Sequence, residues 1–327
     1  MRRKILKAIA IGVITPLSTI WAHTSYAEAW TEKPLTMLIT FGPGGPNDTV
    51  ARLIADGLAK ALDTSIVPTN RPGAGGTIAV SAAVRAPTDG RTMLFATSAN
   101  LTIPPYLYKS LAYDFKSDLT PVIQVASAPM VLAVRSDLGV SSVQELQELA
   151  RTRAGGLTYG SPGTGTTAHL CAELFSNASD IEMVHAPYTG SGPMMMGLLG
   201  GQVDLVFDGI SALAAHAKEG KLRLLAVAGP ERLPNYPDIP TLSEQGVTGA
   251  DASFWNAVLV PASTPPEIVQ RMNQELNALL KSPETQERIG SLGMHPIGGT
   301  PQELAKALEN DYRKWGAAVE RADIKPQ

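Results

Sequence analysis

The sequence predicts an α/β protein of two lobes with a central cleft between them. Strand-like apolar runs alternate with amphipathic helical patterns along most of the chain, and 327 residues exceed the core of one typical domain. Two similar glycine-rich turns, each between an apolar run and a helix, lie about 120 residues apart. Alternating strands and helices require βαβ crossovers, so we expect a mostly parallel sheet that helices cover on both faces.

The N-terminus has the pattern of an export signal. Its basic end consists of Arg2, Arg3, Lys4 and Lys7. A mostly apolar run over 8–20 follows, too short to span a membrane comfortably, and Ser25-Tyr26-Ala27 offers small residues for cleavage. We therefore expect residues 1–27 to be a signal peptide cleaved near Ala27, followed by an exported mature chain.

Charge and cysteine content exclude several classes of protein. Removing the four basic residues of the signal from the 27 Lys and Arg leaves 23 against 30 Asp and Glu, a net charge of −7. Such a chain has no broad basic field, so nucleic acid is not expected as a partner. Cys171 is the only cysteine, which rules out an intramolecular disulfide and indicates a small buried residue. The mature histidines show no metal-binding spacing, so we expect no metal and no cofactor.

The first part of the mature chain predicts one α/β unit. The helix expected over 48–62 carries one apolar stripe, which is the spacing of a helix packed on a sheet. The stripe consists of Val50, Leu53, Ile54, Leu58 and Leu62. The other elements expected here are strands over 35–41, 65–68, 92–97 and 122–134 and a helix over 77–85.

A second α/β unit begins at Ser142, which forms a capping box with Glu145 at the start of a helix. The elements expected in this unit are helices over 143–152, 166–177, 192–199 and 211–218 and strands over 157–160, 183–187, 203–207 and 222–228.

The C-terminal part adds a strand over 254–260 and two long helices. Thr264 with Glu267 is expected to cap the first helix, which runs to about 282. Thr300 with Glu303 is expected to cap the second, which runs through 315.

The two glycine-rich turns are the strongest functional signal. The first is Phe41-Gly42-Pro43-Gly44-Gly45-Pro46-Asn47-Asp48 and the second is Gly160-Ser161-Pro162-Gly163-Thr164-Gly165-Thr166-Thr167. A strand–turn–helix junction presents backbone amides and the positive end of a helix dipole to a ligand. Two such junctions that face each other would hold an anion from both sides, and the hydroxyls of the second suit a carboxylate. The alternative is that both are ordinary turns with helix caps.

Other segments that end strands are candidates for the cleft wall. They are Thr97-Ser98-Ala99-Asn100, Pro187-Tyr188-Thr189-Gly190-Ser191 and Phe207-Asp208-Gly209. Asp208 either accepts a hydrogen bond from a ligand amine or hydroxyl or caps the next helix. A rival interpretation takes 163–168 as a dinucleotide fingerprint, but the acidic residue that this requires after the next strand is absent. The hydrolase elbow G-x-S-x-G and the P-loop are also missing, so we assign no catalytic residue.

With these motifs the chain resembles the solute receptors of tripartite tricarboxylate transporters, the Bug receptors, over essentially its whole mature length. The similar stretches are 41–48, 70–76, 87–90, 160–170, 187–190 and 199–203. The resemblance implies a periplasmic binding protein of the type II fold with two hinge crossings, near 126–131 and 252–257. Lobe 1 would comprise 28–127 and 253–327, and lobe 2 would comprise 128–252.

The resemblance also implies where a ligand binds. The carboxylate would lie between the two turns, on residues carried over as Pro43, Gly44, Gly45, Asp48, Ser161, Gly163, Thr164, Thr166 and Thr167. The rest of the ligand would meet Ser98, Tyr188, Asp208 and Phe254. Thr189 stands where the family commonly has Lys and Gly209 where it has Asn, so we expect the distal pocket to accept a different, less polar molecule.

In function, the resemblance implies a monomeric periplasmic receptor. It would close about a small organic acid and deliver it to the membrane permease subunits of a tripartite transporter. Two alternatives stay open from the sequence: a receptor that feeds signalling rather than uptake, and an extracellular enzyme that acts on organic acids.

Overall fold

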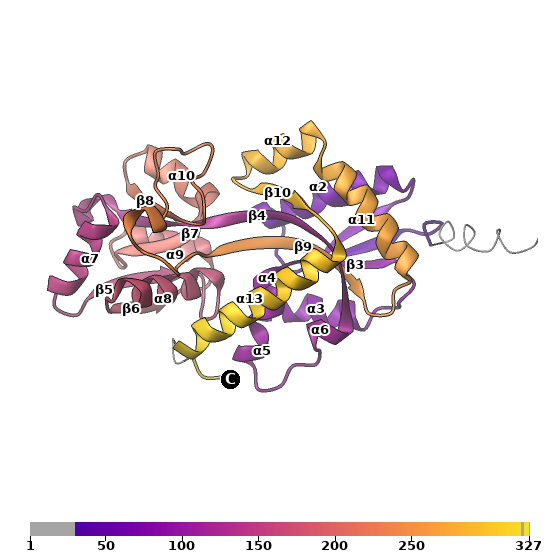
Figure 1. Ribbon diagram of the computed structural model, residues 1–327, viewed down its shortest axis with the longest axis horizontal. Helices are drawn as coiled ribbons and strands as arrows, with labels where there is room; N and C mark the ends of the chain where they lie inside the picture. The colour runs from indigo at the N-terminus through magenta and orange to yellow at the C-terminus, as the bar shows by residue number, and fades with distance from the viewer. Residues whose placement is uncertain (1–29, 322–323, 327) are drawn as a thin grey trace, which may run out of the picture.

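The computed structural model describes residues 30–321 and 324–326, so the expected signal peptide over 1–27 lies outside the described residues. Figure 1 shows two lobes joined by two long strands that cross the middle of the molecule. We call the half that contains β1 to β3 lobe 1 and the half that contains β5 to β8 lobe 2. The strands are β1 (Leu35–Ile39), β2 (Ile66–Asn70), β3 (Thr92–Thr97), β4 (Leu119–Arg135), β5 (Leu157–Ser161), β6 (Met183–Pro187), β7 (Leu205–Gly209), β8 (Leu222–Ala228), β9 (Ser253–Pro261) and β10 (His295–Gly298).

Helices cover both faces of the sheet in each lobe. They are α2 (Pro46–Ala61), α3 (Thr77–Val84), α4 (Ser98–Thr102), α5 (Pro104–Leu107), α6 (Phe115–Asp118), α7 (Val143–Thr152), α8 (Thr167–Ser179), α9 (Ser191–Leu199), α10 (Ile210–Lys218), α11 (Pro266–Leu280), α12 (Pro283–Ser291) and α13 (Pro301–Arg321). Among the described helices, none combines the length and the apolar character that a membrane span requires.

The strands of the described chain form one sheet in the order β2-β1-β3-β9-β4-β7-β5-β6, with β8 and β10 also paired to β4. Pairing is parallel among β1, β2 and β3 and among β5, β6 and β7, as the sequence predicts. The crossing strands β4 and β9 are antiparallel to their neighbours, so the complete sheet is mixed.

β4 belongs to both lobes. Its first part pairs with β9, from Leu119 opposite Pro261 to Pro129 opposite Ser253. From Met130 onward it pairs with β7 and β8 instead. Within the sheet, the chain therefore crosses between the lobes twice, once in β4 and once where β9 begins. The predicted α/β fold with two lobes, a central cleft and two crossings is confirmed.

Each lobe has an apolar core on both faces of its part of the sheet. In lobe 1, α2, α11 and α12 cover one face and α3 and α4 cover the other. In lobe 2, α7 and α8 cover one face and α9 and α10 the other. Cys171 is fully buried in the core beneath α7 and α8, as expected of a small apolar residue.

α13 contacts the cores of both lobes. Leu304 and Leu308, near its start, pack in lobe 1, whereas Trp315, Ala318 and Val319 pack in the core of lobe 2. The helix runs beneath the crossing strands in Figure 1. It is thus a third connection between the halves, and the expected assignment of 253–327 to lobe 1 stays a prediction.

One of the two predicted C-terminal caps is wrong. Thr300 and Glu303 exchange side-chain hydrogen bonds with each other's backbone amides, as predicted. The Thr264 hydroxyl instead donates to the Pro261 carbonyl, and α11 begins at Pro266 without a side-chain cap. The helix starts one residue later than predicted, so its N-cap is Pro265, which has neither a side-chain acceptor nor an N–H group with which to form a capping box.

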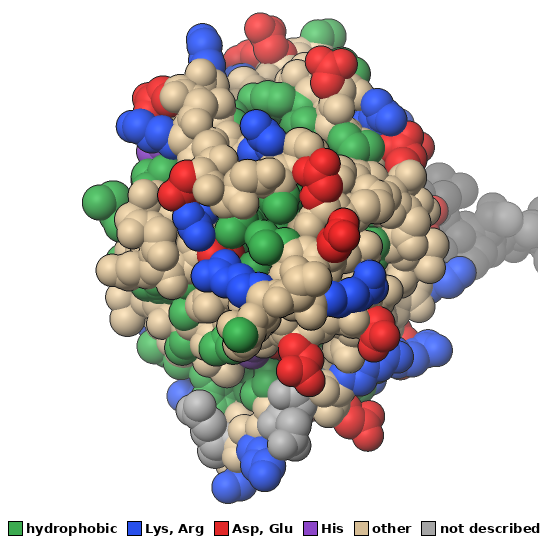
Figure 2. Space-filling model, turned by 90° about the vertical axis from the view of Figure 1, so that its left-hand side faces the viewer, with side chains coloured by type: hydrophobic (Ala, Val, Ile, Leu, Met, Phe, Trp, Pro, Cys, Tyr) green, Lys and Arg blue, Asp and Glu red, His purple; other side chains and the backbone are tan. Residues whose placement is uncertain are grey.

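Figure 2 shows the face at the lobe 2 end of the molecule. Acidic and basic side chains are interspersed over this face, which agrees with the balanced composition of the chain.

Candidate functional site

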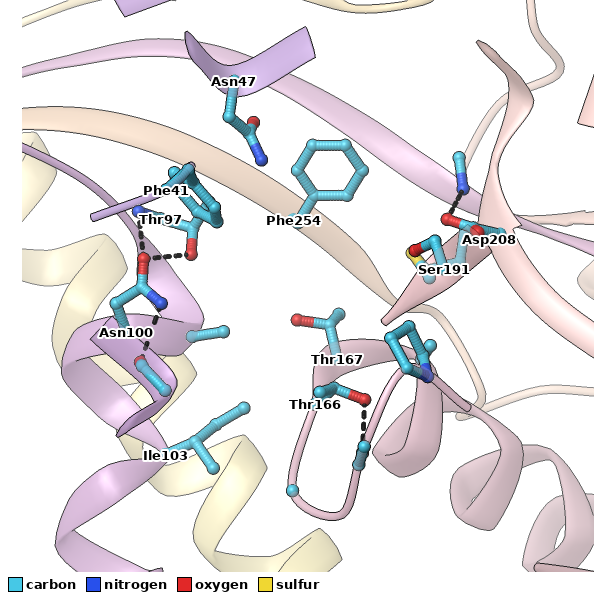
Figure 3. A pocket seen from close by; sticks show the side chains of 18 of the residues that line it. Phe41, Asn47, Thr97, Asn100, Ile103, Thr166, Thr167, Ser191, Asp208 and Phe254 are labelled. Atoms are coloured by element: carbon cyan, nitrogen blue, oxygen red, sulfur yellow. Dashed lines mark hydrogen bonds between the residues drawn. The ribbon is translucent and has the colours of Figure 1, made fainter. Parts of the chain in front are cut away.

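A cavity of about 560 Å3 lies between the two lobes. Figure 3 shows lobe 1 residues such as Asn47, Thr97 and Asn100 on one side and the lobe 2 residues Thr167, Ser191 and Asp208 on the other. Phe254, on the crossing strand β9, projects between them. A molecule in this cavity would contact both lobes and the strand that joins them.

Several helices begin at the wall of the cavity. First-turn or N-cap residues of α2, α8, α9 and α10 line it, together with those of the short helix α4. Each helix start presents amides that lack an intrahelical acceptor and the positive end of the helix dipole. No Lys, Arg or His is among the described residues that line the cavity, and Asp208 is the one carboxylate there. The wall therefore attracts an anion through backbone dipoles rather than through cationic side chains.

In the first turn, the residues that line the cavity are Phe41, Pro46 and Asn47. The expected contact residues Pro43, Gly44, Gly45 and Asp48 are not among the lining residues. Asn47 was absent from the expected set, although its position in the first turn of a helix after glycines was a usable signal. Its buried Oδ1 has no hydrogen-bond partner within the described chain.

Asp48 stabilises the first turn from behind. Its carboxylate accepts hydrogen bonds from the Gly44 amide at 2.9 Å, from Asn70 Nδ2 at 2.7 Å and from Arg52 Nε at 2.9 Å. Burial alone would raise the pKa of Asp48, but the hydrogen bonds from Arg52, Asn70 and Gly44 together outweigh it and lower the pKa. The Gly44 amide is occupied by this carboxylate and is not available to a ligand in this conformation.

The second turn lies in the cavity wall as the sequence predicts. Gly163, Thr164, Thr166 and Thr167 all line it. Thr166 is the N-cap of α8: its hydroxyl donates to the Gly163 carbonyl at 2.8 Å and accepts from the His169 amide. Ser161 is buried behind the turn and donates to the same carbonyl at 3.0 Å. The hydroxyls of Thr164 and Thr167 are therefore the ones in this turn that remain available to a ligand.

Of the four residues expected to contact the rest of the ligand, two line the cavity and two do not. Asp208 and Phe254 line it. Ser98 is buried at the start of α4, and Tyr188 packs against Gly197 while its hydroxyl donates to Gln202 Oε1 at 3.3 Å. The sequence analysis missed the apolar lining residues Phe41, Ile103, Leu107 and Met130.

Asp208 is the acidic feature of the wall. Its Oδ1 accepts from the Gly209 amide at 2.8 Å, at the start of α10. Its Oδ2 is buried and has no hydrogen-bond partner within the described residues. Burial raises the pKa of Asp208 to about 6, and the Gly209 amide and nearby Ser191 hydroxyl offset part of that rise. Asp208 therefore binds the amide of the N-cap residue Gly209, but α10 itself has no side-chain cap, so the expected capping role is wrong, and Oδ2 remains without a hydrogen bond from the described residues.

Comparison with known proteins assigns the chain to a family. Residues 50–324 match the model of the tripartite tricarboxylate transporter family receptor, TctC. The chain belongs to this family. Protein BugT of Bordetella pertussis is 32% identical over 316 residues, which cover 96% of this chain and 97% of BugT. The resemblance inferred from the sequence motifs is thereby confirmed.

Solved structures agree with this assignment. R. palustris Rpa4515 with adipate is 35% identical with a TM-score of 0.82, and the match covers 91% of this chain and 100% of that one. The periplasmic binding protein BugD is 31% identical with a TM-score of 0.78, over 90% and 99% of the two chains. The receptor fold is that of the TctC and Bug periplasmic binding proteins, a family of solute receptors rather than enzymes.

A pair of histidines supports the second turn of this receptor from inside lobe 2. The rings of His169 and His185 stack with centroids 3.9 Å apart, and Tyr159 stacks on His185 at 4.9 Å. His169 Nδ1 accepts from the Gly165 amide at 2.9 Å, and His185 Nε2 lies 2.7 Å from the Ser161 hydroxyl. His169 must be unprotonated at Nδ1 to accept from the Gly165 amide, so protonation there would break this contact. Because the Ser161 hydroxyl donates to the Gly163 carbonyl, His185 Nε2 is the donor toward Ser161.

We expect the two histidines to lower the stability of the receptor as the pH falls from about 6.5 toward about 4, against a smaller opposing contribution from the raised pKa of Asp208. Burial lowers the pKa of His169 to about 3, with a smaller contribution from His185, and lowers that of His185 to about 4. In the unfolded chain both titrate near 6.5, so below that pH the unfolded state binds more protons and is favoured. Each ring contributes at most about 1.4 kcal/mol per pH unit, and the partly exposed His185 contributes less.

Melting temperatures between pH 7.5 and pH 4.5 test this expectation. His185→Phe keeps an aromatic ring against Tyr159 but cannot titrate, so its melting temperature should fall less steeply with pH than that of the wild type. His295→Gln, at an exposed position, should leave the wild-type slope unchanged. Equal slopes for His185→Phe and the wild type would contradict the role assigned to the histidine pair.

Proposed function

We propose that this protein is a periplasmic receptor that captures a small carboxylate-bearing organic acid between its lobes and delivers it to the permease of a tripartite tricarboxylate transporter. It acts as a monomer after removal of the signal peptide near Ala27. The observation that carries the proposal is the cavity between the lobes, which helix starts from both sides line without any cationic side chain in the described wall. The adipate in Rpa4515 supports an organic acid as the ligand.

Capture requires the ligand to contact both lobes. A ligand shifts the balance between open and closed forms only by its difference in affinity for the two. An acid bound by Thr167 of lobe 2 alone would favour neither form. Contacts with Asn47 and the start of α2 in lobe 1 would be added on closure, so closure would be driven by the ligand. The crossing strands β4 and β9 supply the connection about which the lobes would turn.

Thr167→Trp is expected to abolish ligand binding while leaving the fold intact. Thr167 lies at the centre of the cavity in Figure 3, and an indole there would fill the space that a ligand needs. A thermal-shift panel of mono-, di- and tricarboxylic acids should raise the melting temperature of the wild type for at least one acid and of the variant for none. Thr248→Trp, at an exposed position of lobe 2, is the matched control and should behave as the wild type.

Two results would contradict the proposal. Retention of acid binding by Thr167→Trp would show that the ligand binds elsewhere. Chemical conversion of a bound acid by the purified protein would favour the enzyme alternative. Delivery to a permease is tested separately: deletion of the gene should abolish cellular uptake of the acid that binds, and undiminished uptake would favour a sensing role.

A further inference from the structure

The cavity has one end that is already negatively charged. Asp208 lies one residue before the end of β7, beside the start of α10, and its Oδ1 takes up the Gly209 amide that would otherwise be open to an anion. Ser191, the first residue of α9, lies next to it in Figure 3. No cationic side chain in the described wall compensates this carboxylate. An anionic group is therefore favoured near the second turn and opposed near Asp208.

The rest of the cavity wall, including the lobe 1 side opposite Thr167 and Asp208, is mainly apolar. Phe41, Ile103 and Leu107 contribute from lobe 1, and Met130 and Phe254 from the crossing strands. Such a surface favours a hydrocarbon chain or ring and gives a polar group no partner. The volume of about 560 Å3 is within the range of cavities that hold small organic ligands.

We propose that the ligand of this cavity has a single carboxylate, an apolar body, and a hydrogen-bond donor at its far end that Asp208 accepts. The inference rests on the proposed function, since it names the ligand class of the same cavity. Asp208 is then a specificity-determining residue. Its Oδ2 accepts no hydrogen bond from the described chain in this conformation, with the Ser191 hydroxyl nearby, and a hydroxyl or amine of the ligand would supply a donor. A second carboxylate in that position would meet a like charge at low dielectric.

Three six-carbon acids that differ only at the far end test the inference. They are 6-hydroxyhexanoate, hexanoate and adipate, titrated calorimetrically at pH 7.5. We expect 6-hydroxyhexanoate to bind at least tenfold tighter than adipate, with hexanoate between them. Asp208→Asn removes the charge but keeps an oxygen for the Gly209 amide. It should therefore bind adipate at least tenfold tighter than the wild type does.

Asp180→Asn is the control, because it makes the same change at an exposed position of lobe 2 and should preserve the wild-type order. A melting temperature for Asp208→Asn that is no lower than that of the wild type would verify that the variant is folded and that its effect is on the ligand. Two results would overturn the inference and leave the proposed function standing. One is that the wild type binds adipate as tightly as 6-hydroxyhexanoate. The other is that the ratio of the affinities for these two acids is the same in the wild type and in Asp208→Asn. Failure of every acid in the wider panel to bind would contradict both.

Discussion

Gly165→Val is expected to weaken the binding of acids by about 100-fold. This is the loss that follows if the binding-competent closed form is populated at only about 1%. Gly165 lies in the second turn of lobe 2, and a Cβ added to it would overlap the side chain of Leu107 at the end of α5 in lobe 1. Both residues line the cavity. The bulk of valine would hold the lobes apart at the point where they approach each other, so closure about a ligand would be opposed.

Backbone strain has to be separated from this effect. Gly165 has a φ of +76°, a left-handed conformation that is unfavourable for a β-branched residue. Gly139 has a φ of +79° with open space around its Cβ position, so Gly139→Val introduces the same strain without an overlap. Calorimetry should find near wild-type affinity for Gly139→Val.

Leu107→Ala removes the atoms that the new side chain would meet. Combined with Gly165→Val, it should restore at least tenfold of the lost affinity if overlap between the lobes causes the loss. No recovery in the double variant would mean that distortion of the second turn itself is responsible, and would contradict the closure argument.

The sequence predicted the sheet better than the details of the site, for a physical reason. The strands over 92–97, 183–187 and 222–228 match the structure to the residue, because runs of apolar residues bounded by polar turns are local signals. α12 and β10 were missed. The helix predicted to run to about 282 ends at Leu280, and Ser282 caps a separate helix instead. A second helix that follows after so short a break has no distinct apolar pattern.

Site residues were predictable where the backbone supplies the contact. Four of the five expected residues of the second turn line the cavity, all but the buried Ser161, because the position of the turn follows from the strand and helix that it joins. In the first turn the lining residues are Phe41, Pro46 and Asn47, whereas the expected ones are not among the lining residues. Which residue of a turn faces inward depends on hydrogen bonds with distant segments. Here Asn70, from β2, binds Asp48, and the sequence gives no spacing from which that bond could be inferred.

Leu107 and Ile103 are examples of cavity residues that could not be predicted from the sequence. They lie in and beside the short helices α4 and α5, which are too brief to show any periodicity. Their place in the cavity wall follows from the packing of one lobe against the other. Contacts between lobes join residues far apart in the chain, so local sequence pattern carries little information about them.

Asp48→Ala is expected to lower the free energy of unfolding by about 2–3 kcal/mol, because it removes buried hydrogen bonds to a charged acceptor. The side chain of Asp48 is 3% exposed and accepts from Gly44 and Asn70 as well as from Arg52. The Arg52 side chain is 43% exposed, so that ion pair contributes little and the loss comes mainly from the two other donors. Denaturant unfolding at pH 7 measures the change.

The contribution of Asp48 to stability should also depend on pH, which that of an uncharged packed side chain would not. Since the pKa of Asp48 is lowered in the folded protein, its stabilisation is present above the ordinary carboxyl pKa and is lost as the pH falls through the folded value. The difference in stability between wild type and Asp48→Ala should therefore shrink in strong acid. Asp56→Ala, at an exposed position of the same helix, should change stability by less than about 0.5 kcal/mol. Suppose that Asp48→Ala lowered the free energy of unfolding at pH 7 by no more than Asp56→Ala does. The carboxylate of Asp48 would then not be what fixes the first turn against α2, and another contact would have to position Asn47 in the cavity wall.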